Sequence, residues 1–423
     1  MVGGGGREHA LAWKIDQSPH VDAVLAAPGS DAISSIATCF PQLKVTDADA
    51  LIELARSEEV GLVVIGPEDP LAAGVADRLR EAGIAAFGPS ADATRLESSK
   101  SFAKRFMTRH GIPTAAFREF SDLAAATSYV RGLAGPCVVK ADGLAAGKGV
   151  AVCETSAEAE RALDEIMGER RFGDAGAVVI IEELLEGHEV SYYAITDGEH
   201  IATLAPAQDH KRALDGDRGE NTGGMGAYSP VPLVTEAVER RILSEIVEPT
   251  VRGMAEEGNA FSGVLYVGLM LDPSGAPRVV EFNARFGDPE TQPLMMRMED
   301  DLFPILYGSA RGKLDPADKP GRWSGAAVCV VLASRGYPRD CETGIAIDGL
   351  RELEGDPDLA VFHAGTRRRA GGGFETAGGR VLGVTARGDD VAQAAQRAYA
   401  AVDRIRFRGM QVRRDIAALA LST

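Results

Sequence analysis

Short apolar runs alternate with amphipathic stretches along the first hundred residues of the chain. The runs have the length and composition of strands, whereas the longer stretches place apolar side chains at helical spacing. We expect strands at 21–27, 60–66 and 84–88, and helices at 48–59 and 70–83. Strands that alternate with helices predict a parallel sheet with crossover helices.

Loops at the carboxyl ends of such strands are where parallel sheets bind ligands. Two loops hold that position here, one with Pro28 and Gly29 and the other with Gly66, Pro67 and Glu68. The sequence therefore predicts a ligand site at this edge of the sheet.

The pattern changes after residue 98, where a helix leads into a smaller, strand-rich unit. A polar stretch with Gly and Pro at 308–324 then predicts a boundary near residue 318. Strands and one helix follow it, as in a separate α+β domain. We expect an N-terminal parallel α/β domain (1–98), a central domain (99–318) with a small subdomain at about 118–186, and a C-terminal α+β domain (319–423).

The segment from Gln208 to Pro230 has neither a helical nor a strand period, and it combines many charged residues with glycines. A long segment without regular structure inside a compact domain is either functional or disordered. Met225 and Tyr228 are unusual in a polar tether, so we interpret the segment as a substrate loop. A disordered insert is the alternative.

A net charge of -17 disfavours nucleic acid and anionic membranes as partners, because both require a basic surface. Anionic small molecules stay possible, since a few lysines and backbone amides suffice for a phosphate. The five cysteines have no CxxC spacing, and Cys137, Cys153 and Cys329 lie in apolar runs, which predicts buried free thiols. With no apolar run long enough for a membrane span and no visible signal peptide, we expect a cytoplasmic protein.

Glycines 3–6 lead into a helix that begins near Arg7, and free amides at a helix start favour phosphate binding. A flexible N-terminus would explain the same glycines. Only Met1 and Val2 precede them, so we expect the supporting first strand to be curtailed.

A second glycine-rich turn joins two strands between Lys140 and Val150. It departs from the P-loop pattern, because three residues separate Gly143 from Gly147 and Gly149 follows Lys148. A hairpin that closes over phosphates fits better, with lysines at its tip and at the end of its first strand. Two solvated lysines beside a turn are the alternative.

Glu281 and Asn283 lie two residues apart on a predicted strand, so their side chains leave the same face. A carboxylate and an amide oxygen side by side suit Mg2+ that carries nucleotide phosphates. Arg285, Asp288 and Glu290 follow directly, which disfavours a merely solvated strand end. Further upstream, acidic residues flank a Leu-Leu turn that could hold adenosine, although a surface strand end is equally plausible; they are Glu182, Glu183 and Glu189.

Taken in order, these segments resemble the ATP-grasp ligases, and among them the phosphoribosylamine–glycine ligase family. The resemblance runs from GGGGREHALAWK through GPEDPLAAG, KADGLAAGKGV, DHKR, NTGGMGAYSP and EFNARFGDPETQP to FHAGT and RRDI, so it covers essentially the whole chain. The segments in 208–230 and 281–293 are specific to the family, whereas the glycine-rich turn alone is not. Ser30, Ser98 and Glu220 depart from the usual residues, which are Asn, Gly and Pro.

The resemblance implies a central ATP-grasp fold with a lid, and ATP-dependent ligation of glycine to 5-phosphoribosylamine through glycyl phosphate. It implies that ATP contacts Lys100, Lys140, Lys148, Glu182, Glu183, Leu184 and Glu189, and that Mg2+ or Mn2+ binds Glu281 and Asn283. The catalytic residues it implies are Lys148, Arg285, Asp209 and Asp288. The substrate contacts it implies, with the 5-phosphate on the first four, are Gly4, Gly5, Gly6, Arg7, Pro28, Gly29, Gly66, Pro67, Glu68, His210, Lys211, Asn221, Thr222, Gly223, Gly224 and Met225.

Three rival functions stay open at this point. Another ATP-grasp ligase or carboxylase would share EFN and the second glycine turn but should lack NTGGMGAYSP. A nicotinamide-dependent dehydrogenase would not need Glu281 and Asn283, and a nucleotide sensor would be expected to have lost Lys148 or Glu281. The expected partners are small molecules only, and the expected assembly is a monomer or weak homodimer.

Overall fold

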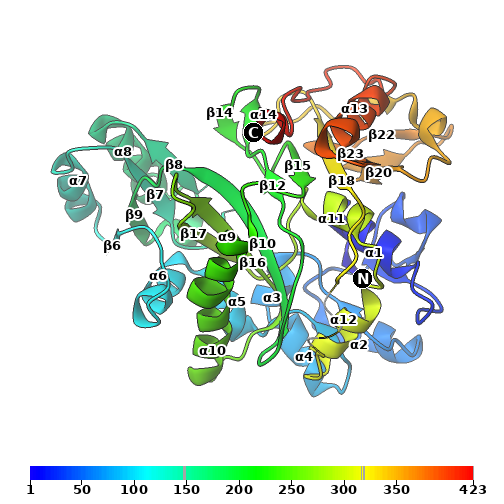
Figure 1. Cartoon of the computed structure of the whole chain (residues 1–423), viewed down its shortest axis with the longest axis horizontal. Helices are drawn as coiled ribbons and strands as arrows, with labels where there is room; N and C mark the ends of the chain where they lie inside the picture. The colour runs from blue at the N-terminus through cyan, green and yellow to red at the C-terminus, as the bar shows by residue number, and fades with distance from the viewer. Residues whose placement is uncertain (146–148, 316, 318–319, 423) are drawn as a thin grey trace.

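The computed structural model describes all residues except 146–148, 316, 318–319 and 423. The N-terminal residues, the C-terminal residues and a small outlying unit surround a central sheet (Figure 1). Lys148 and residue 318, at the expected domain boundary, therefore lie outside the described residues. The boundaries at 98 and 318 stay predictions.

The N-terminal part has the expected alternation of parallel strands and helices. An isolated parallel bridge between Val2 and Ile65 joins its two small sheets. The strands are β1 (Val2–Gly3), β2 (Leu25–Pro28), β3 (Thr38–Cys39), β4 (Val63–Val64) and β5 (Ala86–Phe87). The helices are α1 (Gly6–Ile15), η1 (Ile33–Ser35), α2 (Ala48–Ser57), α3 (Glu68–Ala72), α4 (Val75–Glu81) and α5 (Ala91–Ser98).

The first strand is short, as expected, but it is present. Val2 and Gly3 form β1 and pair with Ala27 and Pro28 of β2. Two residues suffice because β1 is held on both sides, by β2 and by Ile65. The N-terminal glycines therefore follow a strand and open α1, as a phosphate-binding turn requires.

The outlying unit, which we call the lid, is an antiparallel sheet in the order β6-β9-β7-β8. Two helices cover one face, and Val130, Val139, Leu163 and Ile181 are among the residues buried between the layers. The elements are β6 (Phe117–Phe120), α7 (Leu123–Arg131), β7 (Cys137–Ala141), β8 (Val150–Cys153), α8 (Ser156–Leu163), η2 (Asp164–Gly168), η3 (Gly173–Gly176) and β9 (Val179–Glu183). Helix α6 (Lys100–Arg109) leads into the lid.

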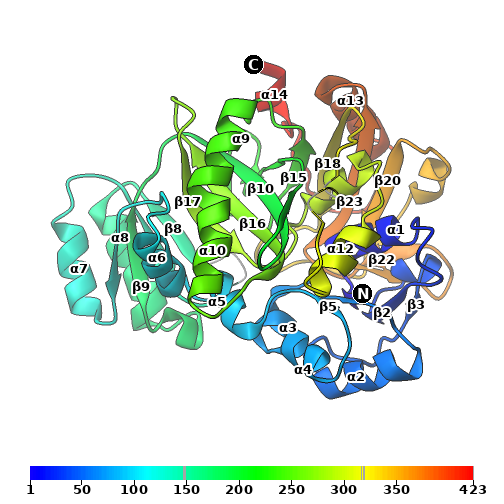
Figure 2. The same cartoon turned by 60° about the horizontal axis from the view of Figure 1, so that its bottom comes forward.

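The central sheet is antiparallel, in the order β11-β10-β16-β17. Figure 2 shows α9 and α10 along one of its faces, where Val251 shares a core with Tyr192 and Leu265 of the sheet. The elements are β10 (His188–Asp197), β11 (Ile201–Thr203), α9 (Glu236–Ile242), η4 (Leu243–Val247), α10 (Glu248–Glu256), β16 (Ser262–Leu271) and β17 (Pro277–Asn283). Helices α11 (Thr291–Arg297) and α12 (Phe303–Ala310) follow.

The C-terminal part contains a five-stranded sheet in the order β12-β15-β18-β23-β20, with α13 packed on it. Its strands are β12 (Gln208–Asp209), β15 (Gly226–Ser229), β18 (Ala326–Ala333), β20 (Leu359–His363) and β23 (Arg380–Gly388). A smaller sheet holds β19 (Ala346–Ile347), β21 (Thr366–Arg368) and β22 (Phe374–Thr376). The helices are η6 (Leu350–Leu353), α13 (Val391–Val402) and α14 (Ala418–Ser422).

The segment from Gln208 to Pro230 is not the irregular loop that its pattern suggested. Its ends form β12 and β15, and β15 pairs with β18 of the C-terminal sheet. Between them, β13 (Arg212–Leu214) and β14 (Arg218–Asn221) form a hairpin. The turn needs glycine at Gly216 and Gly219, where φ is +70° and +84°. Strands this short show no apolar period, which explains the wrong expectation.

Cys137, Cys153 and Cys329 are buried free thiols, which confirms the expectation for these three. No helix within the described part of the chain is long and apolar enough to cross a membrane.

Candidate active site

Three lysines lie where the lid and α6 meet the central sheet. Lys140, on β7, lies 3.0 Å from the Glu182 carboxylate and donates to the carbonyl of Val280 on β17 at 3.2 Å. Lys104 lies 3.0 Å from the same carboxylate. Burial lowers the pKa of Lys104 to about 8 although Glu182 opposes the shift. Glu182 is thus a shared counter-ion that orients both lysines across the gap to the central sheet.

Lys100, the third of these lysines, begins α6 and reaches the edge of the second glycine turn. Its ammonium lies 3.4 Å from the carbonyl oxygen of Gly143. Burial lowers the pKa of Lys100, against the field of Glu281. The described part of the turn therefore lies between two predicted ATP-binding lysines, and Lys148 itself lies outside the described residues.

Glu281 lies on β17 and forms an ion pair with Lys211 at 3.2 Å. The field of Lys211, followed by Lys140 and Lys100, lowers the pKa of Glu281 to about 2 despite its burial. Lys211 also forms an ion pair with Glu189. One ammonium thus joins the 208–230 segment to two carboxylates that the sequence assigned to the nucleotide and the metal.

Asn283 shares a face of β17 with Glu281, and its Nδ2 is buried without a hydrogen-bond partner. The residue opposite Glu281 on β16 is Gly268, where an added Cβ would crowd the Glu281 side chain. Within the described ranges, no group of three or more histidine, cysteine, aspartate or glutamate side chains is placed to hold a metal ion. Two oxygen ligands still fit Mg2+, which takes its other ligands from phosphates and water.

A largely buried polar cluster, which we call the pocket residues, lies near Lys211 and consists of Asp209, Ser191, Tyr193 and Glu290. Burial raises the pKa of the Asp209 carboxyl well above its usual range, and Glu290 and Glu189 add to the shift while Lys211 opposes it. Glu290 accepts a hydrogen bond from Ser191 at 3.1 Å. Tyr193 is buried with its hydroxyl unpartnered. The pocket residues thus offer acceptors for a cation and a free donor for an anion.

The N-terminal glycine turn forms a tight cradle with the two predicted loops. An added Cβ at Gly4 would overlap the carbonyl oxygen of Gly29, and one at Gly66 would overlap the Glu8 carboxylate. Glu8 accepts from the amide of Gly5 at 2.7 Å and from Arg7 at 2.6 Å. The backbones therefore approach one another closely, and the Glu8 carboxylate holds both the Gly5 amide and the Arg7 guanidinium.

Arg285 and Asp288 connect the cradle to the central sheet. The Arg285 guanidinium lies 3.2 Å from Glu68 and 2.9 Å from Glu97. Burial opposes ionisation of Asp288, but Arg380 at 3.2 Å and then Arg7 lower its pKa. Two carboxylates and the carbonyl of Phe286 engage Arg285, which favours a structural contribution beside any contact with phosphate.

Helix α1 also meets the C-terminal sheet behind the cradle. The backbone N–H of His363 donates to Nδ1 of His9 at 3.0 Å. Burial lowers the pKa of His9 to about 4 and that of His363 to about 3. Both rings are therefore neutral at pH 7, and His9 acts as an acceptor.

Some predicted site residues have other partners. Glu183 is exposed, accepts from the amide of Ala116 at 2.9 Å and forms an ion pair with Arg278. Met225 is buried, and its backbone bonds to His210 and Val331. Four more predicted residues of the 208–230 segment lie at the end of β14 and directly after it; they are Asn221, Thr222, Gly223 and Gly224.

The sequence did not point to Lys104, Glu97 or Arg380 as part of the site. Each lies far along the chain from its partner. Only the folded structure places Arg380 beside Asp288. Glu97 could have been found by asking what counter-ion a buried Arg285 requires.

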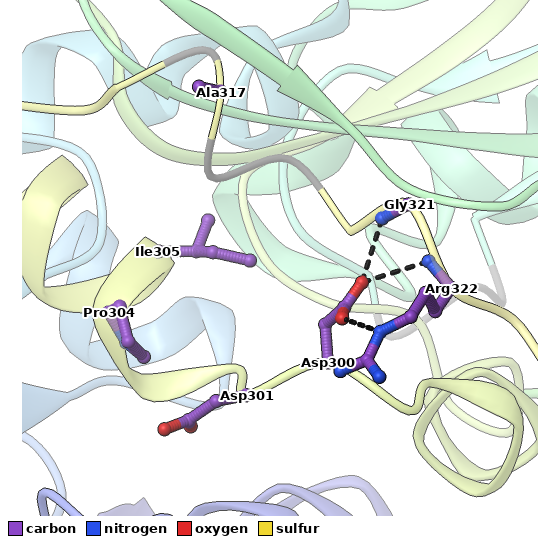
Figure 3. A pocket seen from close by; sticks show the side chains of 7 residues that line it. All are labelled: Asp300, Asp301, Pro304, Ile305, Ala317, Gly321 and Arg322. Atoms are coloured by element: carbon purple, nitrogen blue, oxygen red, sulfur yellow. Dashed lines mark hydrogen bonds and ion pairs between the residues drawn. The ribbon is translucent and has the colours of Figure 1, made fainter.

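The cavity drawn in Figure 3 lies elsewhere, beside the start of α12. Asp300 lines it and accepts from the amides of Gly321 and Arg322. A second cavity of about 260 Å³ opens on the lid, beside Tyr129 and Cys137, and Glu182 and Glu183 also line it. Neither contains Glu281 or Lys211, so the candidate site is defined by the charged network.

The lid lies beside an antiparallel sheet, and lysines and carboxylates lie between the two. This arrangement defines an ATP-grasp protein. The ATP-grasp (A) domain of phosphoribosylglycinamide synthetase matches residues 98–291. The fold also resembles the biotin carboxylase domain of Hydrogenobacter thermophilus 2-oxoglutarate carboxylase, solved with MgADP, with a TM-score of 0.73 at 17% identity, covering 97% of this chain and 90% of that one.

The N domain of the same synthetase matches residues 1–97, and its C domain matches 327–419. Phosphoribosylamine–glycine ligase of Xanthomonas axonopodis pv. citri is 51% identical over 418 residues, covering 98% of this chain and 96% of that protein. The crystal structure of the Thermotoga maritima ligase has a TM-score of 0.84 at 33% identity, covering 98% and 99% of the two chains. The chain belongs to the phosphoribosylglycinamide synthetase family and is an ATP-grasp ligase.

Proposed function

We propose that the chain ligates glycine to 5-phosphoribosylamine and forms glycinamide ribonucleotide, ADP and phosphate, as a step of purine biosynthesis. The contact between Lys211 and Glu281 carries the proposal. It joins the 208–230 segment, which distinguishes this family from other ATP-grasp ligases, to the carboxylate that faces the predicted nucleotide site. The full-length relatives that bear this activity in their names support the same substrates.

The reaction requires activation of a carboxylate, because oxide is a poor leaving group. Glycine attacks the γ-phosphorus of ATP through a carboxylate oxygen, and ADP leaves with glycyl phosphate formed. The neutral amine of phosphoribosylamine then attacks the glycyl carbon, the C–O bond to phosphate breaks, and the amine gives up a proton. Such phosphoryl transfer depends mainly on positioning and on stabilisation of charge.

ATP would lie between the lid and the central sheet. Lys140 and Lys100 would contact its phosphates, and Lys148 would contribute from the glycine turn. Glu182 keeps Lys140 directed toward the central sheet. Glu183 and Leu184 would offer backbone groups to adenine, and Glu189 would accept from the ribose.

Glu281 and Asn283 would hold Mg2+ or Mn2+, which neutralises phosphate charge when it is bound. The low pKa of Glu281 keeps the carboxylate ionised at neutral pH, so it is available as a ligand. Lys211 lies between Glu281 and Glu189 and would also contact phosphate or glycine.

The amine substrate would lie on the N-terminal side. Its 5-phosphate would bind the amides of Gly4–Gly6 with Arg7, close to Gly29 and Gly66. Glu68, the first residue of α3, would face the ribose. Asp209, His210 and Asp288 would orient glycine and the incoming amine. We further propose a cytoplasmic location and a monomer or weak homodimer.

ADP release separates this function from its rivals. The proposal predicts ADP only when glycine and phosphoribosylamine are both present, together with a product of the mass of glycinamide ribonucleotide. ADP release that requires bicarbonate, or another amine in place of phosphoribosylamine, would assign the chain to another ATP-grasp reaction.

A further inference from the structure

Arg413 is a buried arginine far from the candidate site in sequence. Its side chain is 1% exposed. The guanidinium donates from Nε and Nη2 to the two carboxylate oxygens of Asp415, at 2.7 Å each. Its Nη1 reaches the β13–β14 hairpin, where it donates to the carbonyl of Arg212 at 3.1 Å and to Asp217 at 2.8 Å.

The residues beside Arg413 hold the same hairpin. The amide of Arg414 donates to Asp215 at 2.8 Å, and Asp415 accepts from the amide of Gly216 at 2.7 Å. Figure 1 shows β14 beside the C-terminal end of the chain. We call residues Arg413–Asp415 the C-terminal anchor. It contacts both the turn of the hairpin and the start of β13.

The anchor itself is fixed to the C-terminal core. The Tyr399 hydroxyl, on α13, donates to the carbonyl of Arg413 at 3.1 Å and accepts from the amide of Ile416 at 2.9 Å. Ile416 is buried in that core. The anchor can therefore hold a position for other residues.

The hairpin needs such support, because β13 and β14 pair with no other strand in the described structure. Leu214, near its tip, is 55% exposed. An isolated two-stranded hairpin is marginally stable in water. The contacts of the anchor therefore set where the hairpin lies.

Lys211 directly precedes β13, so the position of the hairpin is also the position of Lys211. The amide and the hydroxyl of Thr222, which follows β14, both donate to the carbonyl of Lys211, at 2.7 and 3.0 Å. Its ammonium then meets Glu189 and Glu281. A displacement of Arg212 would be transmitted to this ammonium through one residue.

We propose that Arg413 is a positioning residue of the ligase reaction, which acts through the hairpin to hold Lys211 against Glu281. It touches no predicted substrate site. This inference rests on the proposed function for its kinetic effect, but the placement of the hairpin can be measured without turnover.

The test is a double-mutant cycle between Arg413→Lys and Lys211→Met, on the full chain with all three substrates. Lysine keeps the charge but cannot form the paired bonds to Asp415 together with those to the hairpin. Since small misplacements are costly, Arg413→Lys should lower kcat roughly ten- to a hundredfold. In the Lys211→Met background the same change should have less than about a twofold effect. The proposal is overturned if the kcat losses of the two single variants multiply in the double variant. It is also overturned if folded Arg413→Lys has a normal kcat.

A matched control comes from a second ion pair between the C-terminal part and the same segment. Arg339 lies 2.8 Å from Glu220, but both side chains are exposed. Because exposed pairs contribute little, Arg339→Ala should change kcat by less than about twofold. If Arg413→Lys does not fold, Asp217→Asn removes the charge from a hairpin contact at an exposed position and enters the same cycle.

Hydrogen exchange separates a failure of this inference from a failure of the proposed function. In Arg413→Lys the amides of 212–221 should exchange at least roughly tenfold faster, with the central sheet unchanged. Unchanged exchange in the hairpin would contradict the positioning role whatever the substrates are. If the wild-type chain lacks glycine-dependent ADP release, the ligase assignment fails, and the exchange result alone decides whether Arg413 positions Lys211.

Discussion

Glu281→Gln removes the charge that the candidate site depends on most while keeping the shape of the side chain. In the structure Glu281 Oε1 lies 3.2 Å from the Lys211 ammonium. Its pKa of about 2 means that the carboxylate is ionised at every pH where the enzyme would work. The variant therefore replaces a permanent anion by a neutral amide with one donor and one acceptor.

Two unit charges 3.2 Å apart attract by about 5 kcal/mol at an effective dielectric constant near 20. Desolvation offsets part of this, since both side chains are about two-thirds buried. The loss of one preorganised charged contact costs about 2.7–4 kcal/mol of barrier. We therefore expect kcat to fall between about a hundred- and a thousandfold.

The assay is ADP release at saturating glycine and phosphoribosylamine, repeated across a Mg2+ titration. Glu281→Gln should need more Mg2+ for half-maximal rate and should keep its KM for phosphoribosylamine. Glu189→Gln is the matched control, because it also removes a carboxylate from Lys211, whereas Glu189 is not a proposed metal ligand. It should raise the KM for ATP and leave the Mg2+ dependence unchanged. A Glu281→Gln variant with near-normal turnover and unchanged Mg2+ dependence would refute the assignment.

Three further predictions concern other parts of the site. Lys148→Ala should lower turnover roughly a hundredfold or more, through lost stabilisation of the transferring phosphoryl group; near-normal single-turnover rates would remove Lys148 from the catalytic set. Gly4→Ala should destabilise the chain by about 1–3 kcal/mol, because its Cβ would overlap the carbonyl of Gly29, and should raise the KM for phosphoribosylamine. The control Gly61→Ala has open space around its Cβ, and equal effects in thermal melts and KM would argue against the cradle. Because burial lowers the pKa of His9 from 6.5 to about 4, its neutral form contributes stability that is present above pH 6.5 and is lost as the pH falls toward 4, by about 3 kcal/mol at most. His9→Asn keeps an acceptor for the His363 amide without titrating, so its urea unfolding free energy should fall less than that of wild type between pH 7 and 4.5; parallel pH curves would contradict the neutral role of His9.

The sequence predicts best where one element has one clear period. The alternation in the first hundred residues is present in the structure, although the expected helix at 70–83 is divided into α3 and α4. The two-residue spacing of Glu281 and Asn283 places both on β17. The same patterns predict strands β7 and β8, on either side of the glycine turn after Lys140, and helix α8, which follows β8. Local apolar spacing decides these elements, because each buries one face.

The sequence fails where pairing depends on distant partners. The 208–230 segment looked irregular, yet β15 is held by β18, about a hundred residues downstream. Strands of two to four residues cannot display a period, and their hydrogen bonds come from the partner. The short β1 was doubted for the same reason, and its neighbours Ala27 and Ile65 supply what its length lacks.

Side-chain partners were the least predictable part of the site. Lysines at 140 and 211 could be expected to meet phosphate, but their counter-ions Glu182 and Glu189 are chosen by the fold. A buried charge requires a partner, which says that one exists but not where it lies in the chain. Arg413 shows this most clearly, because its partner Asp217 in the hairpin lies about two hundred residues earlier in the chain.

Oxygen transfer tests the central claim most directly. The wild-type chain is supplied with ATP, phosphoribosylamine and glycine whose carboxylate carries 18O, and the phosphate and nucleotide products are analysed by mass spectrometry. Ligation through glycyl phosphate predicts one 18O atom in each phosphate released, together with stoichiometric ADP and glycinamide ribonucleotide that retains the second 18O. Phosphate without 18O, or ADP formed without the amide product, would contradict the account.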